Sequence, residues 1–169
     1  MRKIFVDGYN VINSWPQLRD IKNSSYESAR TKLIDMLQNY SAFKGWNIIL
    51  VFDAHKVKGS LEKKERMGNL VVVFTKEGES ADNYIERMVN NIGRTLEVYV
   101  VTSDSLEQQV TFQRGAVRIS SLEFYHSMMM DNNKISKSYE TKYSSNRNLL
   151  EENIDMESAK KLEKIRRSK

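Results

Sequence analysis

The sequence predicts an α/β protein in which a central, mostly parallel sheet of about five strands is flanked by helices. Short apolar runs rich in β-branched residues alternate with longer segments of helical periodicity, as in strands joined by helical crossovers. The runs are apolar at consecutive positions, so both faces of each strand are expected to be covered. They cover residues 2–6, 47–52, 70–74, 96–102 and 116–119.

The first strand is expected to end in a turn over residues 7–10, whose glycine can adopt a positive φ. Pro16 then lies in an expected loop. Ser24 and Glu27 form a capping box, which predicts a helix that Gly45 ends. The expected apolar face of that helix has helical spacing and comprises Ala29, Leu33, Met36, Leu37, Tyr40 and Phe43.

The remaining connections are assigned in the same way. Residues 55–69 are polar and are expected to form an exposed loop or a short helix. Ser80 is a good N-cap for a helix that extends to about Ile92. Two further helices are expected, one after Asp104 to about Arg114 and one over residues 122–130.

The composition indicates one soluble domain. A chain of 169 residues with 40% hydrophobic residues can bury a sizeable core. No apolar run approaches the roughly 20 residues that span a bilayer, and an acid follows too soon after the N-terminus for a signal peptide. Together with the absence of cysteine, this predicts a cytoplasmic protein without a membrane partner. The domain is expected over residues 1–130, followed over 131–169 by a polar linker and a basic helix that packs on the domain or extends from it.

The net charge of +5 permits a polyanionic partner but does not require one, because a solvated surface explains it equally well. The last predicted helix, residues 156–167, has the same two interpretations. It is either a solvated helix with one packed side or a basic arm that touches nucleic acid through Lys160, Lys161, Lys164, Arg166 and Arg167.

The acidic residues are the strongest functional signal in the chain. Asp7, Asp53 and Asp104 each follow a predicted strand within about two residues, and Asp82 begins a predicted helix. The carboxyl ends of parallel strands meet at one edge of a sheet, where ligands bind. Two carboxylates about 4 Å apart repel by about 4 kcal/mol at an effective dielectric of about 20, so a cation is expected among them.

A hard divalent cation suits these side chains. With two histidines and no cysteine, the chain lacks the ligands that zinc prefers, whereas carboxylates suit one or two Mg²⁺ or Mn²⁺ ions. Two such ions can stabilise both the attacking and the leaving oxygen of a phosphodiester. Glu79 could share the Asp82 site, and Asn10 could accept from a water or donate to Asp7. Taken singly, each acid also fits ordinary loop or N-cap chemistry. Tyr9 could stack on a base or anchor the loop.

The acidic segments also resemble a known family. Asp7-Gly8-Tyr9-Asn10-Val11-Ile12 resembles the opening of NYN domains, a branch of the PIN-like nucleases. The segments 51–54, 74–82 and 101–104 resemble the YacP-like family within that branch, and residues 147–167 resemble its C-terminus. The resemblance covers nearly all of residues 1–130, in order and at fitting spacing.

The resemblance implies a Rossmann-like PIN/NYN fold and a metal-dependent endoribonuclease that acts in mRNA decay, with the ribosome as a further expected partner. It implies that the catalytic and metal-binding residues are Asp7, Asp53, Asp82 and Asp104. Asn10 and Glu79 would support them. The RNA phosphates are expected to contact Lys56, Lys58, Arg66, Lys76 and Arg114.

Two other classes of function are alternatives to a nuclease. The chain could be an inactive RNA- or ribosome-binding module, although it retains every acid. A receiver-like domain fits less well, because no lysine follows the last strand and Asp82 would be unexplained.

Overall fold

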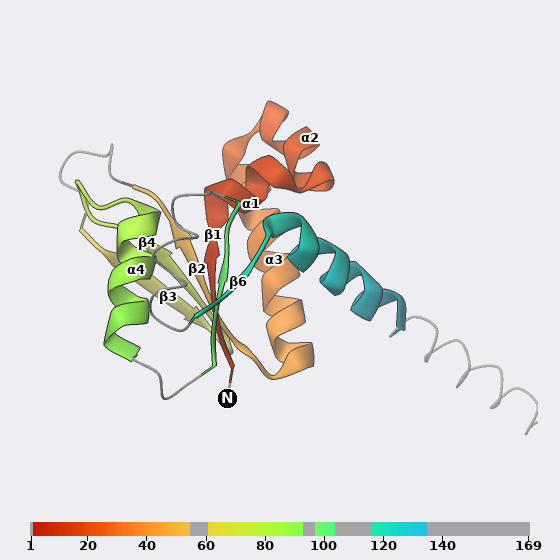
Figure 1. The fold of residues 1–169 in the computed structure, drawn as a ribbon. Coiled ribbons are helices and arrows are strands. Elements are labelled where there is room, and N and C mark those ends of the chain that lie inside the picture. The colour runs from red at the N-terminus through yellow and green to blue at the C-terminus, as the bar shows by residue number, and fades with distance from the viewer. Residues whose placement is uncertain (1, 55–60, 93–96, 104–115, 135–169) are drawn as a thin grey trace, which may run out of the picture. The chain divides into compact units, whose positions relative to one another are not determined.

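The first strand of the chain lies in the middle of the sheet. The structure, a computed structural model, describes residues 2–54, 61–92, 97–103 and 116–134. Within these residues six strands form one sheet in the order β3-β4-β2-β1-β5-β6 (Figure 1). All neighbours are parallel except β3 and β4, so the predicted α/β fold with a mostly parallel sheet is confirmed. The strands are β1 Lys3–Asp7, β2 Asn47–Phe52, β3 Lys63–Met67, β4 Leu70–Phe74, β5 Val98–Val101 and β6 Val117–Ile119.

Strand β3 was not expected, because its residues fell in a segment interpreted as a loop or short helix. It pairs antiparallel with β4 through a tight turn in which Gly68 has a φ of 62°. Its sequence, KKERM, is charged because β3 is an edge strand, and charged side chains protect an open edge from pairing with other chains.

Helices cover both faces of the sheet. Figure 1 shows α3 on one side of the strands and α4 on the other, with α1 and α2 beside the carboxyl end of β1. Residues 121–134 are also helical. The bounds are α1 Gly8–Ser14, α2 Pro16–Ser24, α3 Tyr26–Lys44 and α4 Ala81–Ile92.

Helices α1 and α2 replace the turn and loop expected after the first strand. Asp7 is the N-cap of α1, and its carboxylate accepts a hydrogen bond from the backbone N–H of Asn10. Pro16 is at the start of α2, where a missing N–H costs nothing. Both helices therefore begin with ordinary signals, and the expected turn at Gly8 and loop at Pro16 are wrong.

Helix α3 agrees with its prediction except at two points. Its N-cap is Ser25 rather than Ser24, and the Ser25 hydroxyl accepts from the N–H of Ser28 at 3.2 Å. Gly45 ends the helix with a φ of 64°, as expected. Phe43, however, is 53% exposed, so it does not belong to the buried face of the helix.

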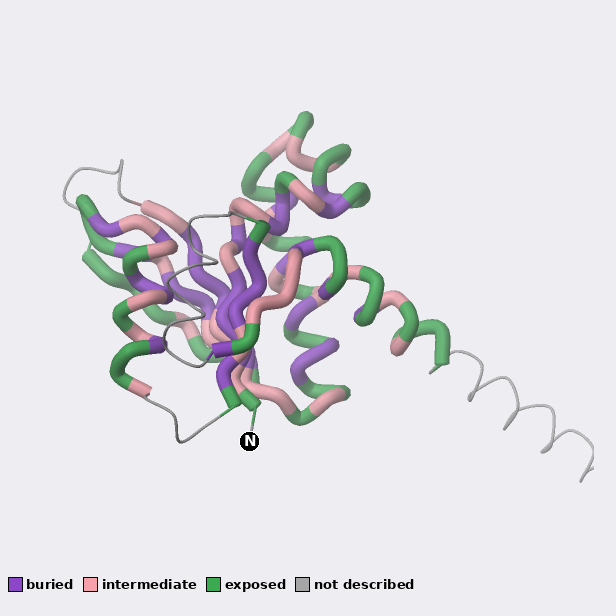
Figure 2. The backbone as a smooth tube through the Cα atoms, in the orientation of Figure 1, coloured by how far each residue is buried: buried purple, intermediate pink, exposed green. Residues whose placement is uncertain are grey.

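The buried residues form a core on the sheet (Figure 2). On the α4 side, Tyr84, Ile85 and Val89 pack in one cluster with side chains of the strands, among them Phe5 and Val51. The predicted N-cap of α4 is confirmed, since the Ser80 hydroxyl accepts from the N–H of Asn83 at 3.2 Å. Continuous apolar strands thus mark a sheet covered on both faces.

The chain divides into two compact units, residues 1–127 and 128–169. The described part of the second unit, residues 128–134, is helical and contains an ion pair of 4.0 Å between Asp131 and Lys134. The predicted linker and last basic helix lie outside the described residues, as does the helix expected after Asp104. Among the helices that are described, none is long and apolar enough to cross a membrane.

Candidate active site

The register of the sheet brings the predicted acids to one edge. Asp7 is paired with Val51 of β2, so Asp53 lies just beyond the end of the same strand pair. Strands β2 and β4 lie on one side of β1, and β5 and β6 lie on the other. The strand order therefore reverses beside β1, and in such sheets the crevice at this point is where ligands bind.

Asp7 caps a helix at this edge and is also held in a partly buried, acidic environment. Its Oδ1 accepts a hydrogen bond of 3.0 Å from the backbone N–H of Asn10, which caps α1. Burial raises the pKa of the Asp7 carboxyl to about 6, against the lowering effect of the Asn10 and Tyr9 N–H groups. The negative charges of Asp82 and Asp53 raise it further.

Asp53 and Asp82 are thus close enough to Asp7 for their charges to act on its carboxyl. Asp53 and Asp82 are both partly buried, one directly after β2 and the other in the first turn of α4. The backbone after Asp53 is held because the N–H of Ala54 donates to the Thr75 hydroxyl at 3.0 Å.

The donor set fits a hard cation in its chemistry, because all three side chains offer carboxylate oxygens and their mutual repulsion would fall when a cation binds. Within the described residues, no three histidine, cysteine, aspartate or glutamate side chains are grouped closely enough to hold a metal ion. The fourth predicted acid, Asp104, lies outside the described residues.

Gly8 lets α1 approach the end of β2. A Cβ atom on Gly8 would lie 2.4 Å from Cε1 of Phe52, far inside van der Waals contact. The positive-φ glycines among the described residues are Gly45, Gly68 and Gly78, so Gly8 is needed for close packing and not for the turn geometry expected from the sequence. This contact fixes Asp7 and Asp53, the neighbours of Gly8 and Phe52, relative to each other.

Asn10 joins three segments beside Asp7. Its Oδ1 accepts from the Ser121 hydroxyl at 2.9 Å and from the N–H of Ser103 at 3.1 Å. Its Nδ2 donates to the Thr102 hydroxyl at 3.5 Å. The support that Asn10 gives Asp7 thus comes from its backbone N–H, whereas its side chain fixes the backbone directly before Asp104.

Glu79 is held by an arginine. Its side chain is 9% exposed, and its Oε1 accepts from Nε and Nη2 of Arg87 at 3.0 and 2.9 Å. Arg87 also contacts Glu62 at 3.4 Å. The other oxygen of Glu79 is buried and has no hydrogen-bond partner. Glu79 could therefore share a metal ion with Asp82, as predicted, only in competition with its ion pair to Arg87.

A model of the YacP-like NYN domain matches residues 4–167. The chain belongs to this family. It is 47% identical over 123 residues to the uncharacterized protein YacP from Bacillus subtilis, and the match covers 71% of this chain and 71% of the relative. The NYN domain has a nuclease-type fold of the PIN-like class, as the acidic segments predicted.

The same fold is found in a crystal structure of Rae1 (YacP) from Bacillus subtilis. That chain is 38% identical, superimposes with a TM-score of 0.71, and the match covers 99% of this chain and 96% of the other. A tryptophan-to-leucine variant of the same protein matches with a TM-score of 0.71 at 35% identity over 84% of this chain and 83% of that one. The α/β architecture is thus shared across the whole NYN domain.

The basic residues predicted to contact phosphates do not lie together in the described part of this NYN domain. Lys76 is exposed in the loop after β4, at the same edge as the acids. Arg66 pairs in register with Val71 near the beginning of β4, at the opposite end of the sheet from that edge. Arg66 is therefore separated from the acids along β3, and its contact with RNA phosphates stays a prediction. Lys56, Lys58 and Arg114 lie outside the described residues.

Two residues that support the site were missed from the sequence. Arg87 is the one cation of α4, but Glu79 lies in the segment before that helix, so no helical spacing relates the two side chains. Ser121 contacts Asn10 across 111 residues, and no local signal reports such a pair.

Proposed function

We propose that this NYN domain is an endoribonuclease that uses Mg²⁺ or Mn²⁺ to hydrolyse RNA phosphodiester bonds. The observation that carries the proposal is that Asp7 and Asp53 lie at the carboxyl ends of adjacent parallel strands, where the strand order reverses. Burial and the charges of Asp53 and Asp82 oppose ionisation of Asp7 there. A protein keeps such an arrangement at a cost to stability, which is typical of active sites.

Each residue has a role in this proposal. Asp7, Asp53, Asp82 and Asp104 would hold one or two ions. The bound ions would supply charge neutralisation at the phosphate and a more acidic water. Asp7 would be a preorganised ligand, because the N–H of Asn10 already fixes its carboxylate. Lys76 is exposed at the same edge and would contact a neighbouring phosphate, which positions RNA without specifying its sequence.

The family membership supports RNA as the substrate, and we extend the proposal to mRNA decay in the cytoplasm with the ribosome as a partner. The experiment incubates purified protein with MnCl₂ or MgCl₂ and end-labelled RNA, free or on translating ribosomes, and maps the new ends. Asp7→Asn is expected to abolish cleavage without loss of RNA affinity. Asp35→Asn, an exposed acid on α3, is the matched control and retains activity.

Full activity of Asp7→Asn, or of the parent protein in EDTA, would refute the proposal. An inactive parent that still binds RNA would instead indicate a binding module whose acids no longer catalyse. Cleavage confined to ribosome-bound RNA would place specificity in the partner.

A further inference from the structure

An exposed aromatic ring lies near the acidic edge. Tyr26, the first residue of α3, is 51% exposed. Its ring makes an edge-to-face contact with Tyr9, with centroids 6.2 Å apart and planes at 72°. Tyr9 follows Asp7 by two residues. The exposed Tyr26 ring therefore contacts the same segment that carries Asp7.

The Tyr26 ring is fixed by its neighbours although half of it faces solvent. Nζ of Lys22 lies 5.8 Å from the ring centroid, and the same ammonium donates to Oδ1 of Asn13 at 2.8 Å. Tyr9 is fixed in turn by Phe52, at a centroid separation of 5.4 Å. A ring that is already ordered loses little rotamer freedom when a ligand stacks on it.

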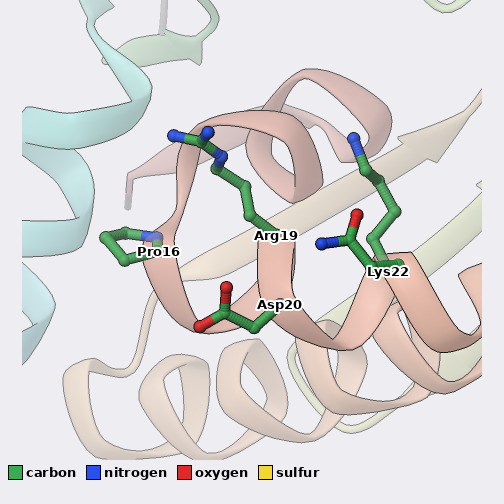
Figure 3. A pocket seen from close by; sticks show the side chains of 5 residues that line it. Pro16, Arg19, Asp20 and Lys22 are labelled. Carbon is green, nitrogen blue, oxygen red and sulfur yellow. The ribbon is translucent and has the colours of Figure 1, made fainter.

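A pocket on α2 shares Lys22 with this ring. It has a volume of about 270 Å³ and is lined by Pro16, Arg19, Asp20, Lys22 and Asn23. Figure 3 shows the cationic ends of Arg19 and Lys22 extending to the same side of the helix, with the Asp20 carboxylate on another side. Two cations line this pocket, and one of them, Lys22, also contacts the exposed Tyr26 ring. This combination matches the chemistry of single-stranded nucleic acid, which offers phosphates and the flat faces of bases.

We propose that Tyr26 stacks on an unpaired base of the RNA while Arg19 and Lys22 contact the adjoining phosphates. This inference rests on the proposed function and adds that the RNA is single-stranded where it meets α2 and α3. Tyr9, which the sequence left open as a stacking residue or an anchor, takes the anchoring role because it packs between Tyr26 and Phe52.

The experiment measures binding of a fluorescein-labelled single-stranded oligoribonucleotide by anisotropy, with the full chain in the Asp7→Asn background so that the RNA stays intact. Tyr26→Ala is expected to weaken binding about tenfold, the usual loss when one base-stacking ring is removed. Tyr26→Trp retains the affinity, because any large flat ring restores the stack. Lys22→Gln weakens binding and reduces its salt dependence, since a phosphate contact is lost.

The same helix provides a matched control. Phe43 is an aromatic residue at the other end of α3 and is 53% exposed, against 51% for Tyr26. Phe43→Ala removes a similar amount of exposed ring and is expected to leave the RNA affinity unchanged. A duplex of the same sequence is expected to bind more weakly than the single strand and to be insensitive to Tyr26→Ala.

Several outcomes would overturn the inference: less than a twofold effect of Tyr26→Ala, an equal loss in Phe43→Ala, failure of Tyr26→Trp to bind, or no measurable binding of the single strand. These outcomes are separate from a failure of the proposed function. That function is judged by cleavage with Mn²⁺ in the protein with native Asp7, where Tyr26→Ala is expected to raise KM and leave kcat unchanged.

Discussion

Replacing Asp7 with asparagine is expected to stabilise the fold at neutral pH while it abolishes cleavage. Asparagine is nearly isosteric and is an equally good N-cap, so its side-chain oxygen can still accept the hydrogen bond from the Asn10 N–H. What the substitution removes is a buried negative charge near Asp82 and Asp53.

The magnitude follows from the pKa of the Asp7 carboxyl, which is raised from 3.8 to about 6 in the folded state. Because the folded-state pKa is the higher one, the parent protein loses stability as pH rises from about 4 to about 6, and the full loss is present above that range. The two pKa values correspond to a penalty of about 3 kcal/mol at pH 7. Near pH 4 the penalty falls below about 1 kcal/mol, because Asp7 is then largely protonated in the folded state.

The assay is urea denaturation of both proteins at pH 7 and at pH 4, in EDTA so that no divalent ion offsets the charge. The midpoint of Asp7→Asn should exceed that of the parent at pH 7, and the difference should largely disappear at pH 4. Equal stability of the two proteins at pH 7, or a difference that does not depend on pH, would refute the electrostatic interpretation of the acidic edge.

Three further predictions concern the same edge. Gly8→Ala should destabilise the fold by about 1–3 kcal/mol in urea denaturation, because the new Cβ would lie 2.4 Å from the Phe52 ring. Phe52→Leu in the same chain should recover part of that loss, and additive effects of the two substitutions would contradict the contact. Arg87→Met should cost about 2 kcal/mol, because the buried Glu79 carboxylate would lose its cation, and Glu79→Gln should reduce that cost in a double-mutant cycle. Saturating Mn²⁺ should raise the melting temperature of the parent by roughly 5–10 °C, a shift that Asp7→Asn loses and Asp35→Asn keeps, as measured by differential scanning fluorimetry.

The sequence predicts the parallel strands and the edge at which the acids meet, because burial on both faces leaves a strong continuous apolar pattern. Ile48, Leu50 and Val51 are fully buried in β2, and Asp53 follows at the expected position. The same logic fails for β3, whose charged sequence reflects an edge position and carries no apolar pattern.

The contacts that support the acids could not be predicted, because they depend on tertiary neighbours. Gly8 lies against Phe52, which is remote in sequence, so its local interpretation as a turn residue missed the packing constraint. The bond between Ser121 and Asn10 likewise depends on where the last helix of the first unit begins, which no local pattern reports.

The bond between Asn10 and Ser121 has a consequence for synthesis of the chain. Asn10 is made early, yet the hydroxyl that fixes its side chain arrives 111 residues later. Strand β1 also lacks its β5 neighbour until residues 98–101 have been made. A nascent chain therefore has most of its acids long before it can hold them in register. The side chain of Asn10 can therefore take its final position only after the chain has been made through Ser121.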